Sequence, residues 1–218
     1  MSLIAHWKLD DCDSNTDVVD AVAAANGVAS VNTDTVGFSV AGKRGNGLYF
    51  AGTRNINLNA FASNGQTYSF AFWLKMQAAT DQRFFDSLAS GGHRLLLRHS
   101  DASNFGLQFY DGAWKTSSHT LSTGTWYHIV YKLDATEGEA DILVDGVSVA
   151  TPAYTGRNIG DTVRMASTYN DTGKANCTLD GFRIYNHLLS ASEIAALMGA
   201  ARPLVGGALA GGHGGLAG

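Results

Sequence analysis

Residues 179–198 read LDGFRIYNHLLSASEIAALM, and the spacing of the apolar residues changes in the middle of this stretch. Residues 179–186 alternate as in a strand, whereas the later apolar residues fall on one helical stripe. Ser190, followed three residues later by Glu193, makes a capping box, and Gly199 is placed to end a helix. The stretch therefore predicts a last strand followed by one short helix.

Segments with strand-like alternation recur along the rest of the chain, and clusters of Gly, Asn or Asp separate them. Their richness in aromatic and β-branched residues favours strands. The other predicted strands are residues 3–9, 46–52, 68–76, 93–99, 105–111, 126–134, 140–146 and 162–168. So many strands with almost no intervening helix predict an all-β antiparallel sandwich in one domain, residues 1–199.

Composition supports this fold class and excludes several functions. Hydrophobic residues make up 45% of the 218 residues, and the 26 glycines and 2 prolines suit short strands joined by turns. A net charge of -4 argues against nucleic acid as a partner, because no basic face can be assembled. No run reaches the ~18 apolar residues that a membrane span needs. The first residues lack the pattern of a signal peptide.

The last segment, residues 200–218, differs from the rest in being rich in Gly and Ala. So many glycines disfavour a stable helix or strand. We predict an appendage that becomes ordered on a protein assembly partner, which can be another copy of this chain in a homo-oligomer.

Several blocks in their order resemble the laminin-G-like, concanavalin A-like jelly-roll family of bacterial and phage type. They are VAGKRGNGLYFAG (residues 40–52), YSFAFWLKM (68–76), TWYHIVYKLD (125–134) and DGFRIYNHLLSASEIAAL (180–197). The resemblance covers roughly residues 3–198. It implies a jelly-roll β-sandwich of two antiparallel sheets, in which the first and last strands lie side by side.

That adjacency bears on Cys12 and Cys177, the only two cysteines. If the first and last strands pair antiparallel with Trp7 opposite Phe182, Cys12 falls opposite Cys177. A disulfide there would join the two ends of the fold and stabilise it by ~2–4 kcal/mol in an oxidising compartment. Two reduced thiols are the alternative.

The resemblance also implies a calcium ion held between an early loop and an acid that opens the last strand. The matching positions are Asp20, Asn26, Gly27 and Asp180. Calcium takes ~6–8 oxygen ligands, and this chain departs from the family's Ser/Gly/Asn-rich loop with the alanine-rich residues 21–25. The alternative role for Asp180 is to accept hydrogen bonds from turn amides.

Candidate sugar-binding residues lie in two polar segments. Tyr110 and Trp114 flank a predicted Asp-Gly turn, and Tyr169 with Asn170 lies in a later loop. Exposed aromatic rings beside amide and acid groups can bind sugar rings. The alternative for each aromatic residue is packing inside the sandwich.

Catalysis finds little support in the sequence. Glu137, Glu139 and Asp141 resemble the acid triplets of glucanases with this fold, but they fall at a predicted hairpin turn. A glycosidase needs two carboxyl groups at a set separation. We therefore expect no enzyme.

The combined expectation is a non-enzymatic surface or recognition module. The first reading is a phage virion decoration or appendage protein that can bind glycan, located on the virion surface or outside the cell. The alternative is a carbohydrate-binding or adhesion module, a lectin, of a secreted bacterial protein. The absence of a leader and the Gly/Ala-rich segment favour the first reading.

Overall fold

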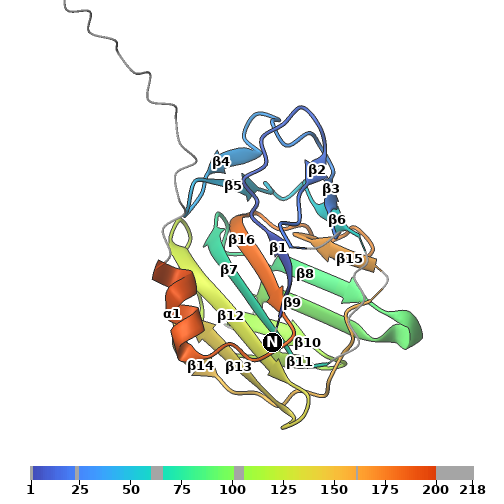
Figure 1. The fold of residues 1–218 in the computed structure, drawn as a ribbon, viewed down its shortest axis with the longest axis vertical. Coiled ribbons are helices and arrows are strands. Elements are labelled where there is room, and N and C mark those ends of the chain that lie inside the picture. The colour runs from blue at the N-terminus through green and yellow to red at the C-terminus, as the bar shows by residue number, and fades with distance from the viewer. Residues whose placement is uncertain (1, 23–24, 60–65, 101–105, 161, 200–218) are drawn as a thin grey trace, which may run out of the picture.

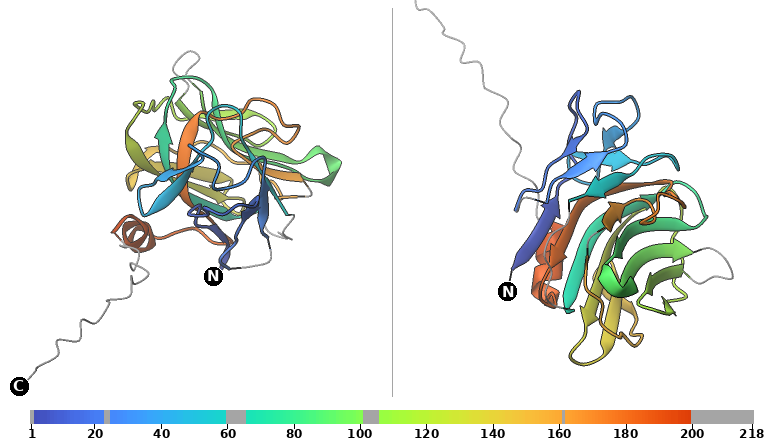
Figure 2. Two further views of the ribbon diagram at one scale, coloured as in Figure 1. Left: turned by 90° about the horizontal axis from the view of Figure 1, so that it is seen from above. Right: turned by 90° about the vertical axis from the view of Figure 1, so that its right-hand side faces the viewer.

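The structure, a computed structural model, describes residues 2–22, 25–59, 66–100, 106–160 and 162–199. Two antiparallel sheets pack face to face, and a single α-helix among these residues, α1 (Ala191–Gly199), lies against one of them (Figures 1 and 2). The predicted all-β jelly-roll sandwich with one short helix is confirmed. Among the described residues no helix is long and apolar enough to cross a membrane. The predicted appendage, residues 200–218, lies outside the described residues.

Sheet A has the strand order β14-β13-β12-β7-β16-β5-β4, and β1 also pairs with β16. The strands in that order are β14 (Val147–Ala150), β13 (Glu139–Val144), β12 (Trp126–Asp134), β7 (Tyr68–Met76), β16 (Cys177–Tyr185), β5 (Asn46–Tyr49), β4 (Ser39–Ala41) and β1 (Leu3–Trp7).

Sheet B has the order β11-β10-β9-β8-β15-β6-β3-β2. Its strands are β11 (Trp114–Thr116), β10 (Gly106–Tyr110), β9 (Arg94–Ser100), β8 (Gln82–Leu88), β15 (Thr162–Met165), β6 (Ile56–Leu58), β3 (Gly27–Ala29) and β2 (Asp17–Val18). A short 3₁₀ turn, η1 (Ser90–Gly92), joins β8 to β9.

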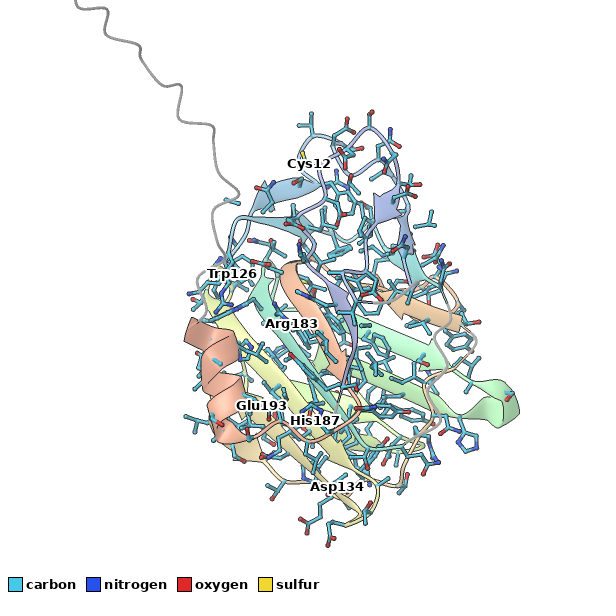
Figure 3. The ribbon with its side chains drawn as sticks, in the orientation of Figure 1. Cys12, Trp126, Asp134, Arg183, His187 and Glu193 are labelled. Carbon is cyan, nitrogen blue, oxygen red and sulfur yellow. The ribbon has the colours of Figure 1, made fainter. Side chains whose placement is uncertain are left out.

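The opening stretch folds as predicted. β16 is followed by α1, and the capping box is formed: the amide of Ser190 donates to Glu193 Oε2 at 2.8 Å, and the amide of Glu193 donates to Ser190 Oγ at 3.3 Å. The Glu193 carboxylate also accepts the Ser190 hydroxyl at 2.7 Å. Its hydrogen bonds with the amide and the hydroxyl of Ser190, and with His187, lower the pKa of Glu193 to about 2. His187 and Glu193 lie together at the start of the helix (Figure 3). The cap fixes how the chain turns from β16 onto sheet A.

Aromatic rings from both sheets fill the centre of the sandwich. Phe182 on β16 is fully buried, and its ring centroid lies 4.8 Å from that of Phe72 and 5.9 Å from that of Phe85. Phe72 belongs to sheet A and Phe85 to sheet B. The rings of Trp7 and Phe70 complete the cluster, with centroids 6.3 and 6.5 Å from that of Phe182. The last strand thus provides the ring that joins the two sheets.

The first and last strands pair as the resemblance implies, with Trp7 opposite Phe182. The predicted disulfide is nevertheless wrong, since both thiols are free. β1 ends at Trp7, and beyond it Leu9 takes a positive φ of 61°. Cys177 remains buried in β16, and its burial raises the pKa of the thiol.

The path of the chain explains why the register does not reach Cys12. The first half of β16 pairs with β5 and not with the N-terminal segment. Leu179 lies opposite Leu48, and Thr178 lies opposite Tyr49. Cys12 therefore lies exposed in a loop beyond the sheet (Figure 3).

Candidate functional site

The outer face of sheet B, turned away from sheet A, carries the site. Along β9, Leu95 and Leu97 point into the core, so the alternate residues Arg94, Leu96 and Arg98 lie on the opposite face. This face holds a pocket of about 260 Å³. Its lining residues are Arg83, Arg94, Leu96, Arg98, Trp114, Thr168, Tyr169, Asn170 and Thr172.

A tight turn brings Trp114 to the edge of this pocket. The Asp111-Gly112 turn joins β10 to β11, and Gly112 takes a φ of 110°, which suits glycine. Asp111 is buried and accepts a hydrogen bond from the amide of Thr155 at 2.8 Å, which holds the turn against the distant segment that contains Thr155. Tyr110 then pairs directly with Trp114, and their rings meet edge to face at 5.2 Å. The indole remains 43% exposed, so it can meet a ligand.

Arginine side chains pack against the aromatic rings of the site. The guanidinium carbon of Arg98 lies 3.5 Å from the centroid of the Trp114 ring. The guanidinium carbon of Arg94 lies 4.9 Å from the Tyr169 ring and 5.9 Å from the Tyr110 ring. Each cation is attracted by the electron-rich face of a ring, which holds both partners in place.

Two aspartates hold the arginines of the pocket in place by accepting hydrogen bonds from them. Asp86 is fully buried and accepts two hydrogen bonds from Arg94, from Nε at 3.0 Å and from Nη2 at 2.6 Å. This pairing raises the pKa of Arg94. The carboxylate of Asp81 accepts one bond each from Arg83 and Arg98, both at 3.3 Å. Burial lowers the pKa of Arg98, and Asp81 counteracts that effect.

The loop of residues 168–172 forms the far wall. Asn170 Oδ1 accepts the hydroxyl groups of Thr168 at 2.7 Å and Thr172 at 2.9 Å. The amide of Tyr169 donates to the buried Asp86 of β8 at 2.9 Å, so this hydrogen bond holds the loop against β8. Among the described residues the Asn170 side-chain nitrogen has no hydrogen-bond partner, so it can donate to a ligand.

The structure therefore brings the four predicted ligand-binding residues, Tyr110, Trp114, Tyr169 and Asn170, into one place. Their role in binding stays a prediction. Sequence reasoning missed the arginines between them. The alternation of residues 93–99 already put Arg94 and Arg98 on one face, but only the sheet register shows that this face adjoins Trp114.

The side chains at the predicted calcium positions make hydrogen bonds within the protein. Asp20 donates its amide to Asn26 Oδ1 at 3.0 Å and accepts the His6 amide at 2.8 Å. Asp180 instead accepts the amide of Arg44 at 2.7 Å, which is the alternative role of binding turn amides. Gly27 is needed for space, because a Cβ there would lie 2.5 Å from a side-chain atom of the neighbouring β6.

A calcium ion at these positions would need several oxygen ligands at one place. One carboxylate oxygen of Asp20, Oδ2, is buried without a hydrogen bond. However, the described part of the chain contains no group of three acidic, histidine or cysteine side chains that could hold a metal. Calcium also takes amide and backbone carbonyl oxygens, so calcium binding stays a prediction with no part in the function below.

The acids considered for catalysis lie on the other sheet. Glu137, Glu139 and Asp141 line a second pocket, of about 250 Å³, at the β12–β13 hairpin. Asp141 is engaged by Lys132 at 3.3 Å and by the hydroxyl of Ser148 at 2.6 Å. They contribute nothing to the pocket on sheet B.

Comparison with known proteins agrees with this fold. The sequence model of one family, Laminin_G_3, described as the Concanavalin A-like lectin/glucanases superfamily, matches residues 50–195. No curated protein matches the chain.

Several solved structures are similar. Domain 4 of AbnA, a GH43 extracellular arabinanase from Geobacillus stearothermophilus, in complex with arabinotriose, has a TM-score of 0.68 and 18% identity, with 90% of this chain and 98% of that chain covered. The ligand binding domain of botulinum neurotoxin serotype D in complex with N-acetylneuraminic acid has a TM-score of 0.65 and 14% identity, covering 90% and 50%. Trypanosoma rangeli sialidase in complex with sialic acid has a TM-score of 0.60 and 14% identity, covering 89% and 32%. At these identities the likeness shows the fold alone.

Proposed function

The chain belongs to the Concanavalin A-like lectin/glucanases superfamily, and from this premise we propose that it is a non-enzymatic module that binds carbohydrate in the pocket on the outer face of sheet B. The observation that carries the proposal is the half-exposed Trp114 ring at the edge of a pocket lined by amide, hydroxyl and guanidinium groups. A sugar has apolar C–H faces that pack on an aromatic ring, and hydroxyl groups that need such polar partners. Two similar structures contain a bound sugar, arabinotriose in one and N-acetylneuraminic acid in the other.

The composition of the pocket favours binding over hydrolysis. Glycoside hydrolysis generally uses two carboxyl groups that flank the scissile bond. The described residues that line this pocket include no Asp or Glu. The nearby Asp86 is fully buried beneath Arg94, which occupies both of its oxygens.

Replacing Trp114 with alanine tests the proposal. We expect sugar affinity to fall at least roughly tenfold, because the variant removes the exposed ring on which a sugar would pack. The measurement is binding of the full chain to a glycan array, followed by calorimetric titration of the best ligand.

Trp126→Ala is the matched control. This tryptophan lies on β12 of sheet A, and its ring also packs under a cation, Lys75, at 5.0 Å (Figure 3). We expect the control to bind sugar like the native protein. Equal affinity of Trp114→Ala and native protein, or no glycan bound by the native protein, would contradict the proposal.

We further propose that the module is displayed outside the cell, as a virion decoration or appendage protein, with residues 200–218 contacting the assembly partner. Helix α1 packs on the outer face of sheet A, where Ile194 and Leu189 contact Ala71, Val130 and Leu143. The described chain ends on α1 at Gly199. The pocket lies on the outer face of the other sheet.

Deleting residues 200–218 tests this setting. We expect the truncated protein to fold and bind sugar with unchanged affinity but to lose incorporation into its assembly. Calorimetry and co-purification with assembled particles measure the two properties. Normal incorporation of the truncated protein would refute the anchoring role and leave the sugar-binding proposal intact.

A further inference from the structure

We infer that the pocket on sheet B selects a sugar that carries a carboxylate, with Arg94 and Arg98 as the residues that recognise this group. The inference rests on the proposed carbohydrate binding and adds the chemical class of the ligand.

The first support is the charge of the pocket. Its described lining contains three arginines, Arg83, Arg94 and Arg98, and no acidic side chain. The chain as a whole has a net charge of -4, whereas here the three arginines outnumber the two aspartates that pair with them, Asp81 and Asp86. Such a local excess of positive charge attracts a small anionic group, whereas the overall charge disfavours a long polyanion.

The second support is the set of hydrogen-bond donors that remain unused. Arg94 uses Nε and Nη2 on Asp86, and Arg98 uses Nε on Gln108 at 2.8 Å and Nη1 on Asp81. Within the described residues, Nη1 of Arg94 and Nη2 of Arg98 have no hydrogen-bond partner. Each arginine therefore keeps an N–H₂ group for a ligand while its other nitrogens fix its position.

The third support is the rigidity of this arrangement. The Arg94 side chain is 26% exposed and is anchored on a carboxylate with no exposure at all. The Arg98 side chain is 13% exposed, and its guanidinium carbon lies over the Trp114 ring, 3.5 Å from the ring centroid. Planar guanidinium groups held in this way match the planar geometry of a carboxylate, and little side-chain entropy remains to be lost on binding.

The neighbouring groups explain why the anion belongs to a sugar. Trp114 offers an exposed ring beside Arg98, and Asn170 offers a free amide nitrogen on the opposite wall. A sugar acid can place its carboxylate on the arginines, its ring face on the indole and its hydroxyl groups near Asn170. A free inorganic anion would leave the ring and the amide unused.

The test uses the full chain and pairs of oligosaccharides that differ only in charge. The panel contains sialic acid-terminated and hexuronic acid-containing oligosaccharides, each beside its carboxyl-amidated form, and sulfated oligosaccharides without a carboxylate. We expect the best acidic ligand to bind at least roughly tenfold more tightly than its amidated form, with sulfated sugars weaker than the carboxylate.

Arg98→Lys keeps the charge but removes the planar donor. We expect it to abolish most of the preference for the acidic form, with binding of the amidated form retained. Arg83→Gln provides a second variant on the same pocket if Arg98→Lys folds poorly, and it should reduce the preference by removing one charge. Circular dichroism and thermal melting check that each variant is folded.

Arg54→Gln is the matched control, because Arg54 also packs on an aromatic ring, Phe38 at 5.1 Å, but lies outside the pocket lining. It should leave the preference unchanged. Equal binding of acidic and amidated forms by the native protein would overturn this inference while the proposed function stands. Sulfated sugars that bind as tightly as the carboxylate would overturn recognition by carboxylate geometry. No binding to any sugar would overturn both proposals.

Discussion

Replacing Phe182 with alanine is expected to destabilise the folded domain by ~3–5 kcal/mol, as for other fully buried phenylalanines. Phe182 has no exposed surface, and its ring lies against rings of both sheets. The variant would leave a cavity between Phe72 and Phe85 that the facing sheets cannot close without moving β-strands. Because a domain of this size is stable by only ~5–15 kcal/mol, a large part of its stability would be lost.

Chemical denaturation followed by tryptophan fluorescence measures this effect. Phe182→Leu, which leaves most of the volume filled, should cost less than the alanine variant. Trp114→Ala is a surface control and should change the free energy of unfolding little. A loss below about 1 kcal/mol in Phe182→Ala would show that the ring cluster does not hold the sheets together.

Acidification from pH 6.5 to 4 is expected to destabilise the protein by about 3 kcal/mol through His128 alone. Burial, with smaller contributions from the positive charges of Arg183 and Arg44, lowers the pKa of His128 to about 4 from 6.5. As the pH falls below 6.5, His128 is protonated in the unfolded chain before it is protonated in the folded protein. The stability that neutral His128 contributes is therefore fully present above pH 6.5 and is lost progressively down to about pH 4.

The surroundings of His128 explain the shift. The side chain is buried on β12 next to Trp73 of β7, with ring centroids 5.0 Å apart. Arg183 of β16 (Figure 3) lies on the same sheet. Asp145 lies nearby in the β13–β14 turn, but it accepts the backbone amide of His128 at 2.8 Å. Nδ1 of His128 is buried without a hydrogen bond.

The free energy of unfolding, measured at several pH values between 7 and 4.5, tests this expectation. His128→Gln should show a shallower decline with falling pH than the native protein, since other groups still titrate. Trp114→Ala, which changes no titratable group, is the control and should keep the native slope. Identical slopes for His128→Gln and native protein would contradict the assignment.

Local sequence patterns were sufficient for the long strands and the helix. Strands such as β7 and β12 are long and rich in aromatic and β-branched residues, so they are recognised directly. The Asp145-Gly146 turn between β13 and β14 is also encoded locally, because Asp-Gly favours the positive φ that such a turn needs, here 49° and 80°. The capping box at Ser190 likewise depends only on residues three apart.

Other elements could not be predicted locally. β2, β3 and β6 are two to three residues long, too short to show a period. β8 reads QRFFDSL, and its polar residues Gln82, Asp86 and Ser87 are fully buried. Their burial is compensated by partners that are distant in sequence or on other elements, such as Arg94 for Asp86, and no local pattern reports such partners.

The sequence by itself determined the fold class, the family and the set of exposed polar and aromatic residues from which a site could be made. Only the tertiary structure decided which of them meet. Trp114 and Tyr169 come from segments far apart in the chain, and the pairing of β8, β9 and β10 places two arginines between them. The tertiary structure also keeps Cys12 apart from Cys177. The edge of β16 along which the β1 pairing would have continued is paired with β5. Periodicity is encoded by neighbouring residues. Contacts between distant segments depend instead on where each strand ends and on which strand pairs next along the same edge.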